Sequence, residues 1–294
     1  ELNQLLLDRA QAAGAELRRE RVMRLHRAVE GWRVRTTHGT EAVDFAIVAM
    51  GARNPLREVG TAFCPADAMT ALGYYVPRQQ GHVDIEFFSG YEGYIWVFPR
   101  TDHLSVGICG KSESGTAMRK RLEAYMAQRH LDLAGARFYA HMLPSLDIRS
   151  WERNRLAGDG WLAAGDTAGL VDPVTGEGIY FAMRSGELAA ECVVNGTTDR
   201  YAAAVNEEFG HDLAYAATLA PRLFKGRYLF GSNTARLIQF VRRSRRLQGI
   251  LQALFAGTMP YHELRTQIKE NLQMTLTEIG ANVFLRRIVS EGME

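Results

Sequence analysis

Apolar positions at the start of the chain predict one helix followed by short strands. They recur at helical spacing from Leu2 to Ala13, and Gly14 follows, which predicts a helix that ends there. Three strand-like runs come next, over residues 16–26, 31–37 and 42–49. The last run, within DFAIVAMGA, is almost wholly apolar, so we expect it to be buried on both faces in a parallel sheet.

The centre of the chain changes to strands in which apolar and polar residues alternate. The segments GHVDIEFFSG, YIWVFPR, HLSVGICG and ARFYAHML show this period between about Phe63 and Ile148, and one helix over residues 115–130 interrupts them. WLAAGD, from Trp161 to Asp166, predicts another buried strand. From Arg200 onward the pattern is helical.

This order of elements predicts the α/β class, with an inserted β-rich domain and a helical C-terminal region. The expected limits are 1–60 and 151–199 for the α/β layer, 61–150 for the insertion and 200–294 for the tail. With 294 residues, 47% hydrophobic and 23% charged, the composition is typical of a soluble globular protein of one large or two smaller domains.

Composition narrows the class of protein further. The apolar runs fall short of the ~18 residues that a membrane span needs. The three cysteines, Cys64, Cys109 and Cys192, show no disulfide or metal-ligand spacing. We therefore expect a cytoplasmic protein with no bound metal and no nucleic-acid partner. Its oligomeric state, monomeric or otherwise, stays open.

The segment GDTAGLVDPVTGEGIYFAMRSGELAAE, from Gly165 to Glu191, predicts a ligand site at a helix start. The first N–H groups of a helix lack partners, and the helix dipole favours an anionic group there. Gly176 and Gly178 let the backbone approach a flat ligand, and Pro173 fixes the entering turn. Asp166, at the end of an apolar strand, is placed to accept hydrogen bonds from sugar-type hydroxyls.

A purely structural role is the alternative for this segment. Ala182, Gly186 and Ala189 are small and share helical spacing, so the helix could simply lie close against a sheet. The residues of this segment by themselves fit both a ligand site and a closely packed helix.

A second motif is the aromatic stretch GYEGYIWVFPR. Tyr94, Trp96 and Phe98 alternate along it, so all three project from one face of a strand. A stripe of this kind forms either a hydrophobic core face or the wall of an apolar pocket.

Together the two motifs resemble the geranylgeranyl reductase family, a branch of the p-hydroxybenzoate hydroxylase-like FAD-dependent oxidoreductases. The resemblance implies an FAD/NAD(P)-binding Rossmann-like domain with an inserted β-rich substrate domain. It implies that Asp166 holds the ribityl chain of FAD and that Tyr94, Trp96 and Phe98 line the substrate pocket. The remaining cofactor-binding residues it implies are Gly165, Pro173, Gly176, Glu177 and Gly178.

Two departures from the family pattern qualify this resemblance. The family carries a Gly-rich turn after its first strand to cradle the pyrophosphate of FAD, and neither Gly-x-Gly pair here fits it. We therefore expect an N-terminally incomplete FAD-binding domain that binds FAD weakly by itself. Met50 stands before Gly51 where relatives have an acid, so the reductant, NAD(P)H or another donor, stays open.

Three functions are weighed. The first is reduction of C=C bonds in an isoprenoid or prenylated substrate by hydride transfer from reduced FAD, with an unidentified proton donor. The second is a flavin-dependent monooxygenase or halogenase on the same scaffold, which more often carries His where Gly169 stands. The third is a non-catalytic fragment. The residues of both motifs match the reductases better, so they favour the reductase.

The helical tail carries a concentration of positive charge. No acidic residue lies between Asp212 and Glu263, although the whole chain has a net charge of only +2. The basic residues in between are Arg222, Lys225, Arg227, Arg236, Arg242, Arg243, Arg245 and Arg246. ARLIQFVRRSRRLQGILQALF resembles a basic amphipathic helix, which predicts docking on an anionic membrane surface. The alternative is a helix that packs its apolar face on the protein.

Overall fold

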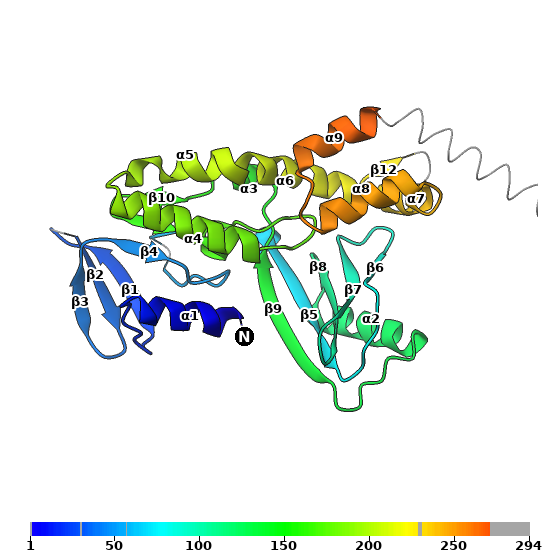
Figure 1. The fold of residues 1–294 in the computed structure, drawn as a ribbon, viewed down its shortest axis with the longest axis horizontal. Coiled ribbons are helices and arrows are strands. Elements are labelled where there is room, and N and C mark those ends of the chain that lie inside the picture. The colour runs from blue at the N-terminus through cyan, green and yellow to red at the C-terminus, as the bar shows by residue number, and fades with distance from the viewer. Residues whose placement is uncertain (1, 30, 57, 229–230, 271–294) are drawn as a thin grey trace, which may run out of the picture.

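A computed structural model describes residues 2–29, 31–56, 58–228 and 231–270. Its helices α4 to α9 form a layer that runs along the length of the molecule (Figure 1). Two β regions lie beneath this layer, a small sheet with α1 at one end and a five-stranded sheet at the other (Figure 1). The architecture is mixed α/β, with a helical C-terminal region, as the sequence predicts.

The end of the molecule that contains the N-terminal helix has two small sheets, the second of which also includes strands from the middle of the chain. Helix α1 spans Leu2–Ala12. The antiparallel sheet comprises β1 (Val22–Arg27), β2 (Trp32–Thr36) and β3 (Thr40–Val43). The second sheet comprises β10 (Ala157–Gly158), β11 (Trp161–Ala163) and β4 (Ala46–Val48), with β11 and β4 parallel.

Three predictions for this region are wrong in detail. The run over residues 16–26 becomes a strand only at Val22. The run over 42–49 is split, because its first part pairs with β2 and its second part crosses to β11. Burial on both faces is also wrong, since Ile47 of β4 is 46% exposed. The helix predicted at the start is confirmed, yet no residue of α1 is buried.

The five-stranded antiparallel sheet follows the order β6-β7-β8-β5-β9. Its strands are β5 (Ala68–Val76), β6 (Asp84–Phe87), β7 (Gly93–Pro99), β8 (Leu104–Gly110) and β9 (Arg137–Pro144). Helix α2, Gly115–Gln128, begins at Ser114, whose side chain accepts a hydrogen bond from the Ala117 N–H at 3.2 Å. Its buried face, with Met118 and Leu122, packs on one side of the sheet and leaves the other side for a pocket.

The helical layer begins with α4, Ile179–Val194, which Gly178 precedes as the N-cap residue. The later helices are α5 (Tyr201–Val205), a π-helical turn (Asn206–Gly210), α6 (His211–Phe224), α7 (Asn233–Val241), α8 (Arg245–Phe255) and α9 (Tyr261–Glu270). The short elements are helix α3 (Ile148–Trp151) and the strand pair β12 (Arg227–Tyr228) and β13 (Gly231–Ser232).

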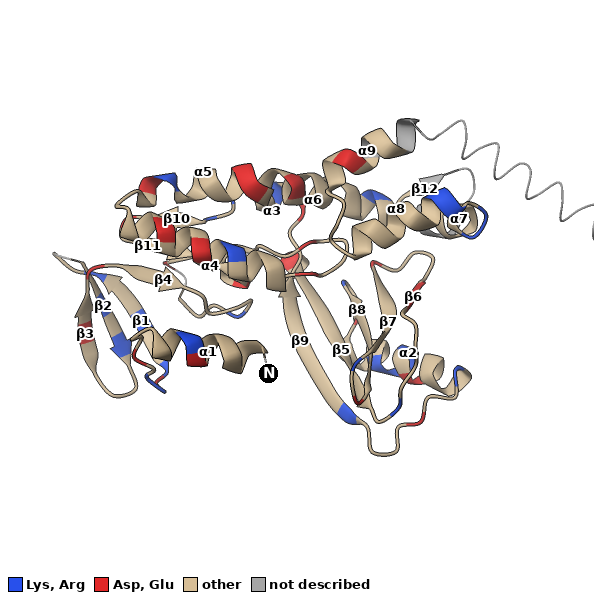
Figure 2. Ribbon diagram, in the orientation of Figure 1, with Lys and Arg blue, Asp and Glu red and all other residues tan. Residues whose placement is uncertain are grey.

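The largest hydrophobic core joins the two small sheets to this layer. Trp32, Leu162 and Tyr201 are buried in it together. The Tyr201 hydroxyl donates to the Ala163 carbonyl at 2.8 Å, which ties α5 to β11. The outer face of α4 is charged instead, and Arg184 there pairs with Glu187 at 2.7 Å (Figure 2).

The basic amphipathic stretch of the tail is two helices, not one. Ser244 interrupts it and caps α8 by accepting a hydrogen bond from the Leu247 N–H at 3.3 Å. Ile250 and Leu254 of α8 are buried, so this helix packs its apolar side on the protein. Within the described residues, no helix is both long enough and apolar enough to cross a bilayer.

Candidate functional site

The turn from Gly165 to Gly178 joins β11 to α4 and begins by packing on that helix. The Gly165 N–H donates to Ser185 Oγ at 3.0 Å. Gly165 has a φ of +58°, and a Cβ there would lie 3.0 Å from the Ala182 Cβ. A glycine is therefore required both by the backbone and by the close approach of α4.

Asp166 has a half-buried carboxylate to which none of the described residues donates a hydrogen bond. Burial alone raises the pKa of this carboxyl group. A Cβ built on Gly178 would lie 3.4 Å from Asp166 Oδ1, so the glycine leaves the carboxylate open at the start of α4. An acid without a partner beside a bare helix start suits a ligand that brings hydroxyl donors.

Asp172 stabilises the second half of the turn through hydrogen bonds to its backbone. Its buried carboxylate accepts hydrogen bonds from the N–H groups of Val174 at 2.7 Å and Thr175 at 3.1 Å. The Tyr261 hydroxyl, from α9, donates to the same carboxylate at 2.7 Å. Burial raises the pKa of Asp172, although these hydrogen bonds oppose the shift. The helical tail thus supports the turn that carries Gly176, where φ is +73°.

We expect Tyr261→Phe to lower the free energy of unfolding by about 1.5–3 kcal/mol, the usual contribution of a hydrogen bond to a charged group. The hydroxyl stabilises the ionised form of Asp172, whose pKa burial raises above its usual value. The loss should therefore be larger at pH 8, where the carboxylate is ionised, than near pH 4. Urea unfolding at both pH values measures it. Tyr215→Phe on α6 is the matched control, and an equal loss in both variants would contradict the assignment.

The pocket lies on the face of the five-stranded sheet that α2 does not cover. Strand register arranges this face in rows across β7, β8, β5 and β9. The first row is Phe98, Ser105, Tyr75 and Arg137; the second is Trp96, Gly107, Gly73 and Tyr139; the third is Tyr94, Cys109, Ala71 and His141. The cavity measures about 1050 Å³, near the upper end of the range of ligand pockets.

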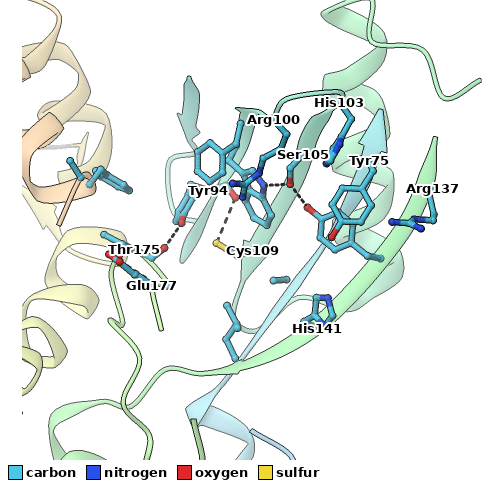
Figure 3. Close-up of a pocket in the computed structure, with 18 residues that line it drawn as sticks. Tyr75, Tyr94, Arg100, His103, Ser105, Cys109, Arg137, His141, Thr175 and Glu177 are labelled. Carbon is cyan, nitrogen blue, oxygen red and sulfur yellow. Dashed lines mark hydrogen bonds between the residues drawn. The ribbon is translucent and has the colours of Figure 1, made fainter. Parts of the chain in front are cut away.

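Two aromatic rings lie over the glycines of the second row. A Cβ on Gly107 would overlap the Trp96 indole, and a Cβ on Gly73 would lie 2.7 Å from the Tyr139 hydroxyl. Ser105 Oγ is 3.3 Å from Trp96 Nε1 and 2.8 Å from the Tyr139 hydroxyl. The paired glycines therefore allow an aromatic floor, which Ser105 fixes from both sides (Figure 3).

The third row meets the Gly-Glu-Gly turn. The Tyr94 hydroxyl donates to the Thr175 carbonyl, and Thr175, Gly176 and Glu177 close this end of the pocket (Figure 3). Burial raises the pKa of the neighbouring Cys109 thiol to about 12 and that of the Tyr94 phenol even further, so both stay protonated at neutral pH. Burial, and secondly the charge of Asp172, raise the pKa of Glu177.

The structure brings together most, not all, of the residues that the motifs single out. Tyr94, Trp96 and Phe98 line the pocket with Gly176 and Glu177. Gly165, Asp166, Pro173 and Gly178 do not line it; Asp166 and Gly178 face each other across the start of α4. The roles that the resemblance implies for these residues stay predictions.

Several lining residues were not predicted from the sequence. Phe255 of α8 also lines the pocket, and so does Cys109, which is buried beside Tyr94. Arg137, Tyr139 and His141 alternate within ARFYAHML, so the sequence predicts that they share a face, but it does not predict that their strand pairs with β5.

Comparison with solved structures shows which fold the chain shares. A geranylgeranyl bacteriochlorophyll reductase-like protein from Thermoplasma acidophilum matches with a TM-score of 0.69 at 18% identity, over 96% of this chain and 74% of that one. Klebsiella pneumoniae HpxO, complexed with FAD and uric acid, matches with a TM-score of 0.59 at 18% identity, over 87% and 70% of the two chains. A tryptophan 6-halogenase from Streptomyces toxytricini also matches, with a TM-score of 0.59 at 14% identity, over 97% and 66%. The fold is the Rossmann-type fold of FAD-binding flavoproteins.

Comparison of sequences is more specific. The digeranylgeranylglycerophospholipid reductase of Methanothrix thermoacetophila is 30% identical over 210 residues, which are 65% of this chain and 52% of that protein. The chloroplastic geranylgeranyl diphosphate reductase of Arabidopsis thaliana is 35% identical over 135 residues, 45% and 27% of the two chains. No protein-family model matches. The chain spans about half the length of the first of these curated relatives and about a quarter of the second. The predicted resemblance to the geranylgeranyl reductases is confirmed.

Proposed function

We propose that the protein carrying this chain is an FAD-dependent oxidoreductase that reduces C=C bonds of a prenyl chain. One observation carries the proposal: the aromatic pocket ends at the Gly-Glu-Gly turn, and the Tyr94 hydroxyl joins the two. A long apolar ligand on the aromatic floor would therefore extend to the helix start where the flavin is expected. The names of the curated relatives, which are reductases of geranylgeranyl compounds, support this substrate class.

The residues at the helix start fit the flavin end of FAD. Asp166 offers an acceptor that has no partner within the described residues, and Gly178 keeps the space beside it open. The dipole of α4 would favour the negative charge of a reduced flavin. Bound FAD would supply a hydride, and its reduction requires a donor such as NAD(P)H. The protic groups at this end of the pocket include Glu177, Cys109 and Tyr94.

A flavin-dependent monooxygenase or halogenase is the second candidate, because such proteins share the fold. The reductase is favoured because the curated relatives at 30% identity or more are named as reductases. A non-catalytic role is the third candidate.

Flavin spectroscopy tests the proposal. In the flavin-loaded protein, geranylgeraniol should shift the visible absorption of the flavin, since the chain would reach the ring along the aromatic floor. Trp96→Ala should abolish the shift, and Trp151→Phe on α3, outside the pocket, should retain it. An unchanged spectrum at saturating geranylgeraniol would contradict the proposed substrate class.

We also propose that the tail docks on an anionic membrane surface, which would shorten the path of a prenyl substrate to the pocket. Lys and Arg residues gather around α7 and α8 (Figure 2), and each contributes about 1 kcal/mol beside anionic lipid. The burial of Ile250 and Leu254 supports the alternative for α8, a helix that packs on the protein.

Vesicle flotation tests this docking. Recovery should require anionic lipid, fall with added salt, and drop when Arg242, Arg243, Arg245 and Arg246 become Gln. Equal recovery with neutral and anionic vesicles would refute membrane docking.

A further inference from the structure

The end of the pocket remote from the Gly-Glu-Gly turn is basic. Arg100 and His103 lie in the turn between β7 and β8, where the Arg100 N–H donates to the His103 carbonyl at 2.8 Å. Arg137, at the start of β9, lines the same end (Figure 3). Arg100 and His103 of one hairpin and Arg137 of a strand distant in sequence therefore line the same end of the cavity.

Tyr75 positions two of these groups. The Arg137 guanidinium carbon lies 5.1 Å from the centre of the Tyr75 ring, a cation–π distance. The His103 ring meets the same ring edge-on at 5.0 Å, and Tyr139 stacks on it at 4.5 Å. The basic groups are thus held beside the aromatic floor.

The two arginines at this end have no acidic partner among the described residues. Within the described residues, neither Arg100 nor Arg137 forms an ion pair, whereas His103 faces Asp102 at 2.6 Å. Glu177, the acid that lines the pocket, lies at the opposite end (Figure 3). The pocket therefore has a basic end, an aromatic middle and an acidic end at the turn.

We propose that Arg100 and Arg137 bind the phosphate group of a prenyl phosphate ester, so that its chain runs over the aromatic floor toward the turn. This rests on the proposed function. A guanidinium binds phosphate oxygens through paired, charge-assisted hydrogen bonds. Phe98 and Tyr94 are four residue steps apart along β7, about 13 Å at strand rise. Such a ligand would be held at its head while bonds further along its chain reach the turn.

Equilibrium binding to the flavin-free chain, followed by the change in tryptophan fluorescence to which Trp96 in the pocket contributes, tests the proposal with matched ligands. Geranylgeranyl diphosphate should bind at least about tenfold more tightly than geranylgeraniol, the equivalent of one charge-assisted hydrogen bond. Added KCl should shrink this difference. The double variant R100Q/R137Q should remove it while still binding geranylgeraniol, which shows an intact pocket. R24Q/R33Q, on exposed residues of β1 and β2, is the charge-matched control.

The outcomes separate this proposal from the proposed function. Equal affinities for diphosphate and alcohol, or an unchanged preference in R100Q/R137Q, would overturn the phosphate site alone. Failure of both prenyl ligands to bind would overturn the prenyl pocket as well. A third ligand, digeranylgeranylglyceryl phosphate, distinguishes the source of the phosphate: tighter binding than the diphosphate identifies a lipid headgroup, and weaker binding identifies a free prenyl phosphate.

Discussion

Gly178→Val is expected to abolish flavin binding while the protein still unfolds cooperatively. A Cβ at this position would lie 3.1 Å from Val171 Cγ2 and 3.4 Å from Asp166 Oδ1, so valine methyl groups would fill the space beside the carboxylate. Overpacking typically costs about 1–3 kcal/mol, which alone lowers flavin affinity about 5- to 150-fold, and the blocked approach of the ring to the helix start adds to this loss. The backbone at Gly178 has a φ of −138° and a ψ of −18°, outside the main regions that valine favours. We therefore expect the fold to lose about 1–3 kcal/mol through backbone strain and the poorer N-cap, and still to unfold cooperatively.

Glu191→Val provides the control for this prediction, since it places the same side chain in α4 at an exposed position. Flavin titration by absorbance, together with urea unfolding, compares the two variants in the protein carrying this chain. Normal flavin loading by the Gly178 variant would show that the bare helix start is only structural.

Gly107→Val should displace the Trp96 indole and destroy the pocket that we propose for the prenyl chain. The added Cβ would occupy the position of the indole ring, which lies on this glycine across the β7–β8 pair. We expect geranylgeraniol affinity to fall at least about tenfold and stability to fall by about 1–3 kcal/mol, the cost of overpacking. Fluorescence of Trp96 should shift toward that of a solvated indole.

A double-mutant cycle keeps this prediction testable if the single variant folds poorly. In a Trp96→Ala background the indole is gone, so the same valine should cost much less stability. Equal costs in both backgrounds would show that Gly107 does not support the indole.

The sequence predicts elements well where one pattern dominates. The four strands with alternating residues and helix α2 were all predicted, and α4 begins where its Gly-Glu-Gly start indicates. Strand β5 was missed because both its faces are apolar, one toward α2 and one toward the pocket. No alternation marks such a strand.

The candidate site was predicted only as far as local motifs extend. Tyr94 and the turn near Gly176 were recognisable because neighbouring residues carry each motif. The hydrogen bond between Tyr261 and Asp172 joins residues 89 positions apart, and no local pattern predicts it. Arg137 reaches the pocket through the register of β9 on β5, which depends on pairing that a single strand does not reveal.

The most direct test is a single turnover without oxygen. The flavin-loaded protein, reduced and mixed anaerobically with geranylgeranyl diphosphate, should return its flavin to the oxidised spectrum as the prenyl chain gains two hydrogens per flavin. Mass spectrometry of the product and absorbance of the flavin follow both halves of the reaction. Flavin that stays reduced until oxygen is admitted, with an oxygen atom then found in the product, would contradict the reductase and identify a monooxygenase.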